Sequence, residues 1–138
     1  MPETASARRR IPDAREKSDG PTFGVVVINW NNADETMRCV EILDAADPAP
    51  DHVVIVDNGS EDDSINRLEA WADEHWIWRV GNTAHGEDRP SDGVPWLIIA
   101  RAGANRGFAG GCNVGIRYLQ QRTSVSHFLL LNNDASIL

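Results

Sequence analysis

Short apolar segments recur along the chain, separated by polar turns and by segments with helical spacing. Within the apolar segments the hydrophobic residues run without alternation, which is typical of strands in a parallel sheet that helices cover on both faces. The pattern predicts strands at residues 23–29, 53–56, 96–100 and 127–131. The β-branched first strand is expected to be central in the sheet, and the last strand to be buried on both faces.

The segments between the strands predict three helices. They cover residues 34–46, a stretch that begins at Ser60, and residues 109–121. Asp34 is expected to cap the first helix, and the spacing of Ser60 and Asp63 resembles a capping box that begins the second. Residues 76–80 fit either a short extra strand or an extension of the second helix.

The order β-α-β-α-β-α-β predicts the fold class. It implies right-handed crossovers, so we expect an α/β fold of the Rossmann-like three-layer α/β/α type with a mostly parallel sheet. Residues 23–138 are expected to form one domain. Residues 1–22 mix basic and acidic residues with few apolar ones, which predicts a disordered tail. The polar, turn-rich segment 81–95 is either a surface insertion or a functional loop.

Charge and cysteine content narrow the function classes. The net charge of −8 argues against nucleic acid or an anionic membrane as the main partner, because both are bound by basic surfaces. An anionic small ligand stays compatible, since a bound cation reverses the local field.

Cys39 and Cys112 belong to no metal-binding pattern, so we expect reduced, buried thiols. The chain shows no secretory leader and no apolar run of about 18 residues, which makes the cytoplasm the expected location.

Polar or glycine-rich stretches follow each predicted strand. The carboxyl ends of parallel strands meet at one edge of the sheet, where open α/β sheets bind their ligands. The stretches that we expect to converge there are residues 29–32, 57–60, 103–111 and 132–134.

The second and third of these stretches are candidates for nucleotide binding. Asp57 can accept a hydrogen bond from a base or a ribose hydroxyl, although residues 57–60 are also ordinary turn chemistry. The glycines of residues 103–115 let a ligand approach backbone N–H groups at a helix start. Because these glycines match neither GxGxxG nor GxxxxGK[ST], a dinucleotide fold or a P-loop enzyme is disfavoured. For Gly110, Gly111 and Gly115 the alternative is close packing of the helix on the sheet.

The last stretch is a candidate metal site. Mg²⁺ and Mn²⁺ prefer oxygen ligands and often use one or two carboxylates together with substrate phosphates. Asp134 with the amides of Asn132 and Asn133 could supply the protein part of such a shell. The alternative is a polar transition from a strand to a loop.

Together, the four stretches resemble motifs of the family 2 glycosyltransferases of the GT-A fold, in particular the rhamnosyltransferase-like branch. The resemblance covers residues 23–135, in the family's order. The motifs that support it are VVVINWNN at 25–32, VDNGS at 56–60, NRGFAGGCNVG at 105–115 and LLLNNDA at 129–135.

The resemblance implies a role for individual residues. The first strand end would pack against the base, the second would bind the base or ribose, and the third would lie near the nucleotide and sugar. The implied nucleotide-binding residues are Asn29, Trp30, Asn31, Asp57, Asn105, Arg106 and Gly107. The DxD-type metal motif falls on residues 132–134, with Asp134 and Asn132 as ligands of a divalent metal, Mg or Mn.

The chain departs from the family's pattern at two positions within these motifs. Asn132 stands where the first Asp of DxD is found, which lowers the negative charge of the metal site. Cys112 stands where most relatives would have a further Asn.

The resemblance implies an inverting, metal-dependent transfer of a sugar from a nucleotide-diphosphate sugar, dTDP- or UDP-linked by preference. The acceptor would be a cell-envelope glycan or a lipid-linked molecule, which leaves open a peripheral location at the inner face of the membrane. The base that takes the acceptor's proton is expected beyond Leu138. We therefore expect the donor-binding half of an enzyme, incomplete for turnover by itself.

Two other function classes are alternatives. A non-catalytic nucleotide-binding or interaction module would keep the fold without the chemistry. A sugar nucleotidyltransferase would have a glycine-rich loop with Arg or Lys after the first strand. Since Trp30, Asn31 and Asn32 occupy that place, this class is disfavoured.

Overall fold

The computed structural model of the chain describes residues 21–75 and 95–134. The predictions for the tail up to residue 20, for residues 76–80 and for most of the segment 81–95 therefore lie outside the described residues. Of the predicted tail, Thr22 is described, and its backbone and hydroxyl exchange hydrogen bonds with Ser126.

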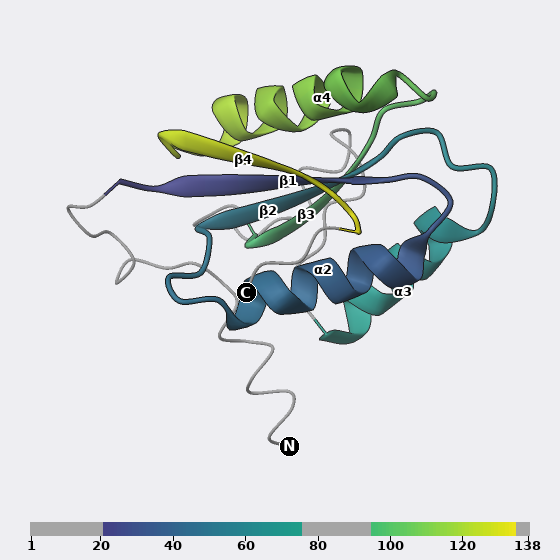
Figure 1. Cartoon of the computed structure of the whole chain (residues 1–138), viewed down its shortest axis with the longest axis horizontal. Helices are drawn as coiled ribbons and strands as arrows, with labels where there is room; N and C mark the ends of the chain where they lie inside the picture. The colour runs from purple at the N-terminus through teal and green to yellow at the C-terminus, as the bar shows by residue number, and fades with distance from the viewer. Residues whose placement is uncertain (1–20, 76–94, 135–138) are drawn as a thin grey trace.

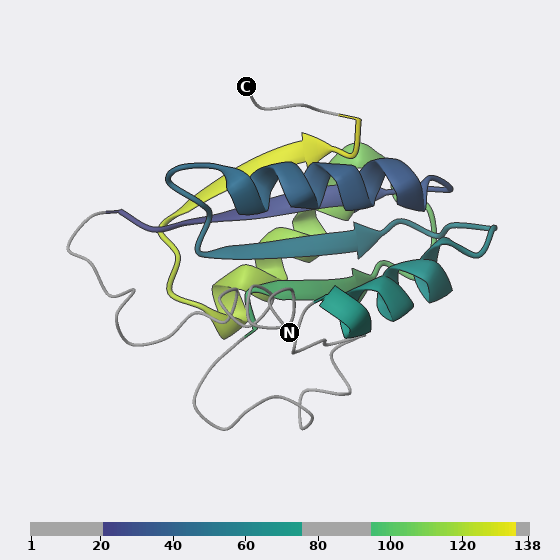
Figure 2. The same cartoon turned by 90° about the horizontal axis from the view of Figure 1, so that it is seen from below.

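The described elements alternate strictly between strands and helices. They are β1 (Phe23–Asn29), α2 (Ala33–Ala45), β2 (His52–Asp57), α3 (Ser64–His75), β3 (Leu97–Arg101), α4 (Gly107–Arg122) and β4 (His127–Asn132). The four strands form one parallel sheet in the order β3-β2-β1-β4. Helices α2 and α3 lie on one face and α4 on the other (Figures 1 and 2). The predicted Rossmann-like three-layer α/β/α fold is confirmed.

The inner strands supply side chains to a core on each face of the sheet. Val25 and Val27 of β1 belong to the core beneath α2 and α3, whereas Val26 and Ile28 belong to the core beneath α4. Since successive residues of a strand point to opposite faces, an unbroken apolar run is needed when both faces are covered. The predicted central position of the first strand is confirmed.

The prediction that the last strand is buried on both faces is wrong. Among the described strands, β4 pairs with β1 alone and lies at the edge of the sheet. Leu129 and Leu130, on opposite faces, are 39% and 37% exposed. Helix α4 packs mainly against β1 and β2, so its cover does not extend fully over β4. An apolar run indicates a strand but does not distinguish an inner strand from an edge strand.

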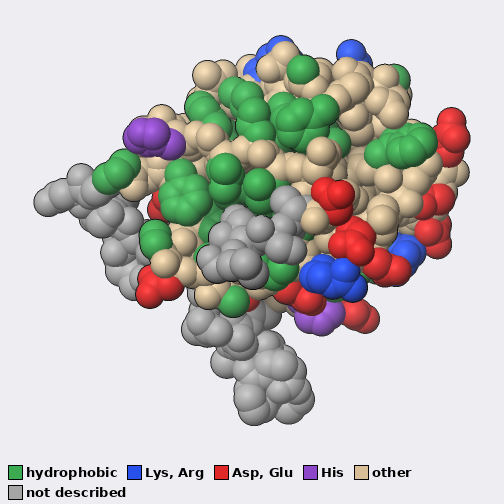
Figure 3. Space-filling view, in the orientation of Figure 1, with side chains coloured by type: hydrophobic (Ala, Val, Ile, Leu, Met, Phe, Trp, Pro, Cys, Tyr) green, Lys and Arg blue, Asp and Glu red, His purple; other side chains and the backbone are tan. Residues whose placement is uncertain are grey.

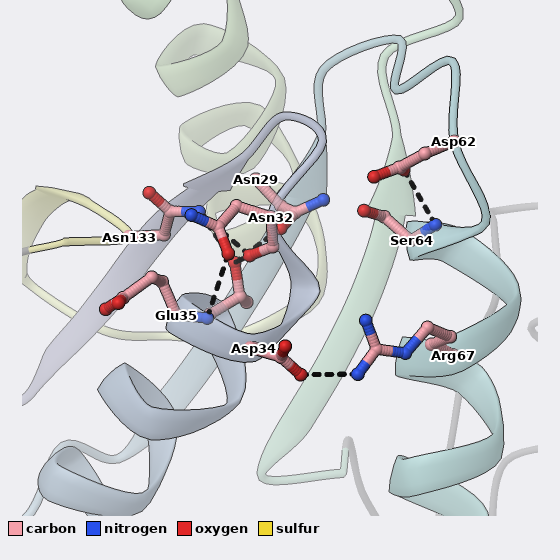
Figure 4. Close-up of polar contacts among 9 residues, drawn as sticks. Asn29, Asn32, Asp34, Glu35, Asp62, Ser64, Arg67 and Asn133 are labelled. Atoms are coloured by element: carbon pink, nitrogen blue, oxygen red, sulfur yellow. Dashed lines mark hydrogen bonds and ion pairs between the residues drawn. The ribbon is translucent and has the colours of Figure 1, made fainter.

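The predicted helix caps also differ from the observed ones. Asn32, not Asp34, caps α2, with its side-chain oxygen accepting a hydrogen bond from the Glu35 N–H at 3.4 Å. Asp34 instead forms an ion pair with Arg67 of α3 (Figure 4). Helix α3 begins at Ser64, so the capping box predicted from Ser60 and Asp63 is wrong as well. The side chain of Asp62 accepts a hydrogen bond from the Ser64 N–H at 2.9 Å.

Two of the three ambiguous glycines serve close packing of α4 on the sheet. A Cβ at Gly115 would lie 2.5 Å from Val26 Cγ1, and one at Gly111 would lie 3.1 Å from Ile28 Cδ1. Gly110 is different, because a Cβ there would lie 2.6 Å from the Cβ of Arg106. Gly110 therefore makes room for the Arg106 side chain rather than for the sheet.

Candidate functional site

All four strands end at the same edge of the sheet because they are parallel. The polar stretches predicted to converge therefore do so, at the edge where the strand arrows point in Figure 2. Side-chain hydrogen bonds between these strand ends organise the edge in detail.

Asp57, at the end of β2, is the centre of a buried polar cluster. Its carboxylate accepts hydrogen bonds from the Asn29 side-chain amide at 3.0 Å and from the Ser60 hydroxyl at 2.6 Å. A further bond comes from the Ser60 N–H at 3.1 Å. Asp57 is 6% exposed and Asn29 is 0% exposed. Asn29 thus fixes the Asp57 carboxylate, and its own side chain has no free surface for a ligand.

Thr36 of α2 extends this cluster toward β4. Its hydroxyl lies 2.5 Å from the Asn29 side-chain oxygen, to which it donates, and it accepts from the Asn133 side-chain amide at 3.1 Å. Asn133 also donates to the backbone carbonyl of Asn32 at 3.2 Å (Figure 4). The ends of β4, β1 and β2 are therefore joined through one chain of polar side chains.

The turn after β1 presents Trp30 to solvent. Asn31 adopts a left-handed backbone conformation with φ 56°. Its side-chain oxygen accepts from the N–H groups of Glu61 and Asp62 at 2.7 and 3.3 Å, and its own N–H donates to the Ser60 hydroxyl at 2.9 Å. These bonds hold the turn in place, and Trp30, which directly follows Asn29 in the chain, is 48% exposed.

Asn58 docks the loop before α4 onto the end of β2. Its buried side chain donates to the Gly107 carbonyl at 3.1 Å and accepts from the Arg106 N–H at 3.1 Å. Gly59 lies against the same loop with φ +78°, where a Cβ would be 2.6 Å from the Ala104 backbone carbon. The predicted stretch 105–107 is thereby brought next to Asp57.

The end of β4 places Asn132 and Asp134 at the surface, while Asn133 is held against α2. Among the described residues, no group of three or more His, Cys, Asp or Glu is arranged to hold a metal ion. A divalent cation at Asp134 would thus need most of its oxygen ligands from a bound molecule and water, as Mg²⁺ commonly does. Asp134 and the amide oxygen of Asn132 fit such an open shell as its protein part.

The pKa of the Cys39 thiol is affected by the negative charges near the end of β4. Burial, and then the negative charges of Asp134 and Glu35, raise the pKa of Cys39 to about 11. The thiol is therefore neutral at physiological pH, and the predicted buried, reduced state is confirmed for both Cys39 and Cys112. The same field that disfavours a thiolate would favour a cation at Asp134.

Arg106 was predicted to bind the nucleotide, but its side chain points away from the Asp57 cluster. Its backbone N–H binds Asn58, but its Nε donates to the Ala102 carbonyl at 2.8 Å. The guanidinium lines a cavity of about 490 Å³ beside α4, together with Arg101 and Arg117. The Asn105 side chain stays within its own loop, where its oxygen accepts a hydrogen bond from the Gly107 N–H at 2.9 Å.

Three organising residues were absent from the predicted site. They are Thr36, Asn58 and Ser60. Asn58 and Ser60 lie within the polar stretch 57–60 that the pattern singled out. Asn133 was predicted as a possible member of the metal shell, and its side-chain amide donates to Asn32 and Thr36. Thr36 lies inside a helix and shows no local signal.

Comparison with protein-family models and with curated proteins found no match. The family resemblance therefore depends on the four motifs alone. No helix in the described part of the chain is both long enough and apolar enough to cross a membrane.

Proposed function

We propose that this domain binds the donor of an inverting, metal-dependent glycosyltransferase, a nucleotide-diphosphate sugar with uridine or thymidine as its base. The observation that supports the proposal most strongly is the polar chain from Asn133 through Thr36 and Asn29 to Asp57. These hydrogen bonds hold the candidate metal site and the candidate nucleotide site in fixed positions along one edge of the sheet. A ligand that occupies both sites at once requires such fixed positions.

In this proposal the nucleoside binds between Trp30 and Asp57. The exposed indole offers a face on which a base can stack. The Asp57 carboxylate, with about four acceptor sites, retains capacity for a base N–H or a ribose hydroxyl beyond the bonds it makes within the protein. Asn29 and Asn31 support these contacts from behind, and the backbone of residues 105–107 borders the nucleotide and sugar.

Asp134 and Asn132 would hold Mg²⁺ or Mn²⁺ at the diphosphate. When bound, the metal supplies Lewis-acid stabilisation of the departing diphosphate. The acceptor class proposed is a cell-envelope glycan or lipid-linked molecule, met at the inner face of the membrane. We assign no described residue to the base that removes the acceptor's proton.

The test is calorimetric titration with UDP, dTDP and GDP, each with and without Mn²⁺. We expect metal-dependent binding of UDP or dTDP that Asp134→Ala weakens at least about tenfold, because a direct metal ligand is lost. Glu41→Ala, which removes one exposed carboxylate from α2, is the matched control and should bind like the wild type. If none of the three nucleotides binds, the donor site is not where we place it.

The single carboxylate at the end of β4 favours a second candidate, a nucleotide-binding module of the same fold without turnover. Release of nucleoside diphosphate from a UDP- or dTDP-sugar separates the two. Metal-dependent binding with measurable release supports the transferase, whereas binding without release supports the module.

A further inference from the structure

Charge is distributed unevenly over the two faces of the sheet. Residues 101–133 include Arg101, Arg106, Arg117 and Arg122 but no aspartate or glutamate. The acidic residues of the described chain lie elsewhere, many of them on α2 and α3 and the turn between β2 and α3. Figure 3 shows arginine side chains at the top of the molecule, where α4 lies, and most carboxylates lower down. In a chain of net charge −8, the α4 side is thus a local cationic surface.

The cationic surface contains a groove, which we call the arginine groove, lined by Arg101, Arg106, Asn113 and Arg117. Arg106 and Arg117 come from one side of α4, with Asn113 between them at helical spacing. Gly110 forms part of the wall, and its missing Cβ leaves room for the Arg106 side chain. The volume of about 490 Å³ is typical of a small-molecule site.

The guanidinium groups of the groove are only partly neutralised by the protein. Arg101 forms an ion pair with Glu69 at 3.0 Å, and this is the only ion pair between described residues that involves the groove. Arg106 is oriented by its Nε bond to the Ala102 carbonyl, which leaves its terminal NH₂ groups for other partners. Among the described residues, none that lines the groove is acidic.

We propose that the arginine groove binds a phosphorylated ligand through a phosphate or diphosphate group. Guanidinium groups match phosphate oxygens in bidentate geometry, and several of them together favour a multiply charged group over a single carboxylate. The groove is separate from the Asp134 end of the proposed donor site. It lies beside β3, and β3 and β4 are opposite edges of the sheet, roughly 14 Å apart at the spacing of neighbouring strands. Its nearest part of the donor site is the nucleotide end, because Arg101 is the register partner of Asp57. Arg106 is accordingly assigned to the groove.

Inorganic pyrophosphate in the presence of EDTA is the probe. Without a divalent metal the Asp134 end cannot contribute, so the result is independent of the metal end of the proposed donor site. We expect pyrophosphate to bind the full chain, with affinity that Arg117→Gln lowers about tenfold or more, because one charge-assisted interaction is lost. The control is Arg38→Gln, which removes the same charge from an exposed position on α2, on the opposite face.

A second experiment distinguishes a lipid headgroup from a soluble phosphate ester as the ligand of the arginine groove. Cosedimentation with phosphatidylcholine vesicles is compared with and without phosphatidic acid. Phosphatidic acid-dependent binding that Arg117→Gln abolishes supports a lipid headgroup, whereas pyrophosphate binding without vesicle binding supports a soluble phosphate ester. If pyrophosphate does not bind, or if Arg38→Gln weakens it as much as Arg117→Gln does, the proposal is overturned.

Discussion

Asn29 and Asp57 are register partners at the ends of β1 and β2, and a hydrogen bond of 3.0 Å joins their side chains inside the protein. Each is the last residue of its strand. A buried carboxylate needs hydrogen-bond donors, and here a neighbouring strand and the following turn supply them. The bond thereby sets the orientation of the carboxylate that we propose binds the nucleoside.

Removing the Asn29 amide should destabilise the fold. Asn29→Ala leaves Asp57 without one donor and the Thr36 hydroxyl without its acceptor, which costs about 1–3 kcal/mol for a buried polar group left unpaired. Urea denaturation measures the loss. The control is Gln120→Ala, an exposed position on α4, which should leave the free energy of unfolding within about 0.5 kcal/mol of the wild type. Equal midpoints for the two variants would contradict the role of this bond.

Thr36 should connect stability to ligand binding. Thr36→Val keeps the shape but removes the hydroxyl that joins Asn29 and Asn133. We expect a loss of about 1–3 kcal/mol in unfolding free energy. We also expect weaker Mn²⁺-dependent UDP binding, because Asn133 loses one of the two hydrogen bonds that hold it against α2 and the turn before it.

The Thr36→Ser variant distinguishes the contribution of the Thr36 hydroxyl from that of its methyl group. The serine variant keeps the hydrogen bonds and should bind UDP like the wild type. If Thr36→Val changes stability but leaves UDP affinity unaltered, Thr36 is a structural residue and does not position the site.

The strand positions and the sheet edge could be predicted from the sequence because both depend on local pattern. Unbroken apolar runs located all four strands, and the polar residues after each run marked the edge where they end. Their parallel arrangement then brought Asn29, Asp57, residues 105–107 and the end of β4 to one place.

The details that could not be predicted depend on contacts between distant residues. Ser60 has the spacing of a helix cap, but its hydroxyl binds Asp57, and both uses follow from the same local sequence. Likewise, nothing near Thr36 indicates that Asn133, far along the chain, would reach its hydroxyl. The exposure of β4 depends on how far α4 extends over the sheet, which the apolar run of β4 does not encode.

The edge position of β4 predicts tolerance to charge. In Leu129→Lys the long side chain can keep its methylene groups on the sheet and place its amine in water, so we expect a loss below about 1 kcal/mol. Val26→Lys, at a fully buried position of β1, should prevent folding. Since an uncharged edge strand favours pairing with other chains, Leu129→Lys should also reduce self-association in sedimentation velocity. A severe loss of stability in Leu129→Lys would show that this side chain is covered.

The raised pKa of Cys39 predicts a decrease in stability at alkaline pH. The folded chain holds the Cys39 pKa at about 11, compared with 9.0 for an unperturbed thiol. Above the lower value the unfolded chain loses its proton while the folded chain keeps it, so unfolding becomes more favourable as the pH rises. Stability should therefore be unaffected by this group below pH 9.0 and should fall as the pH approaches about 11.

The measurement is the free energy of unfolding as a function of pH for the wild type and Cys39→Ala. Because burial also raises the pKa of Cys112, the variant should retain part of the decrease, and its slope should be smaller than that of the wild type. Identical slopes would show that Cys39 does not contribute.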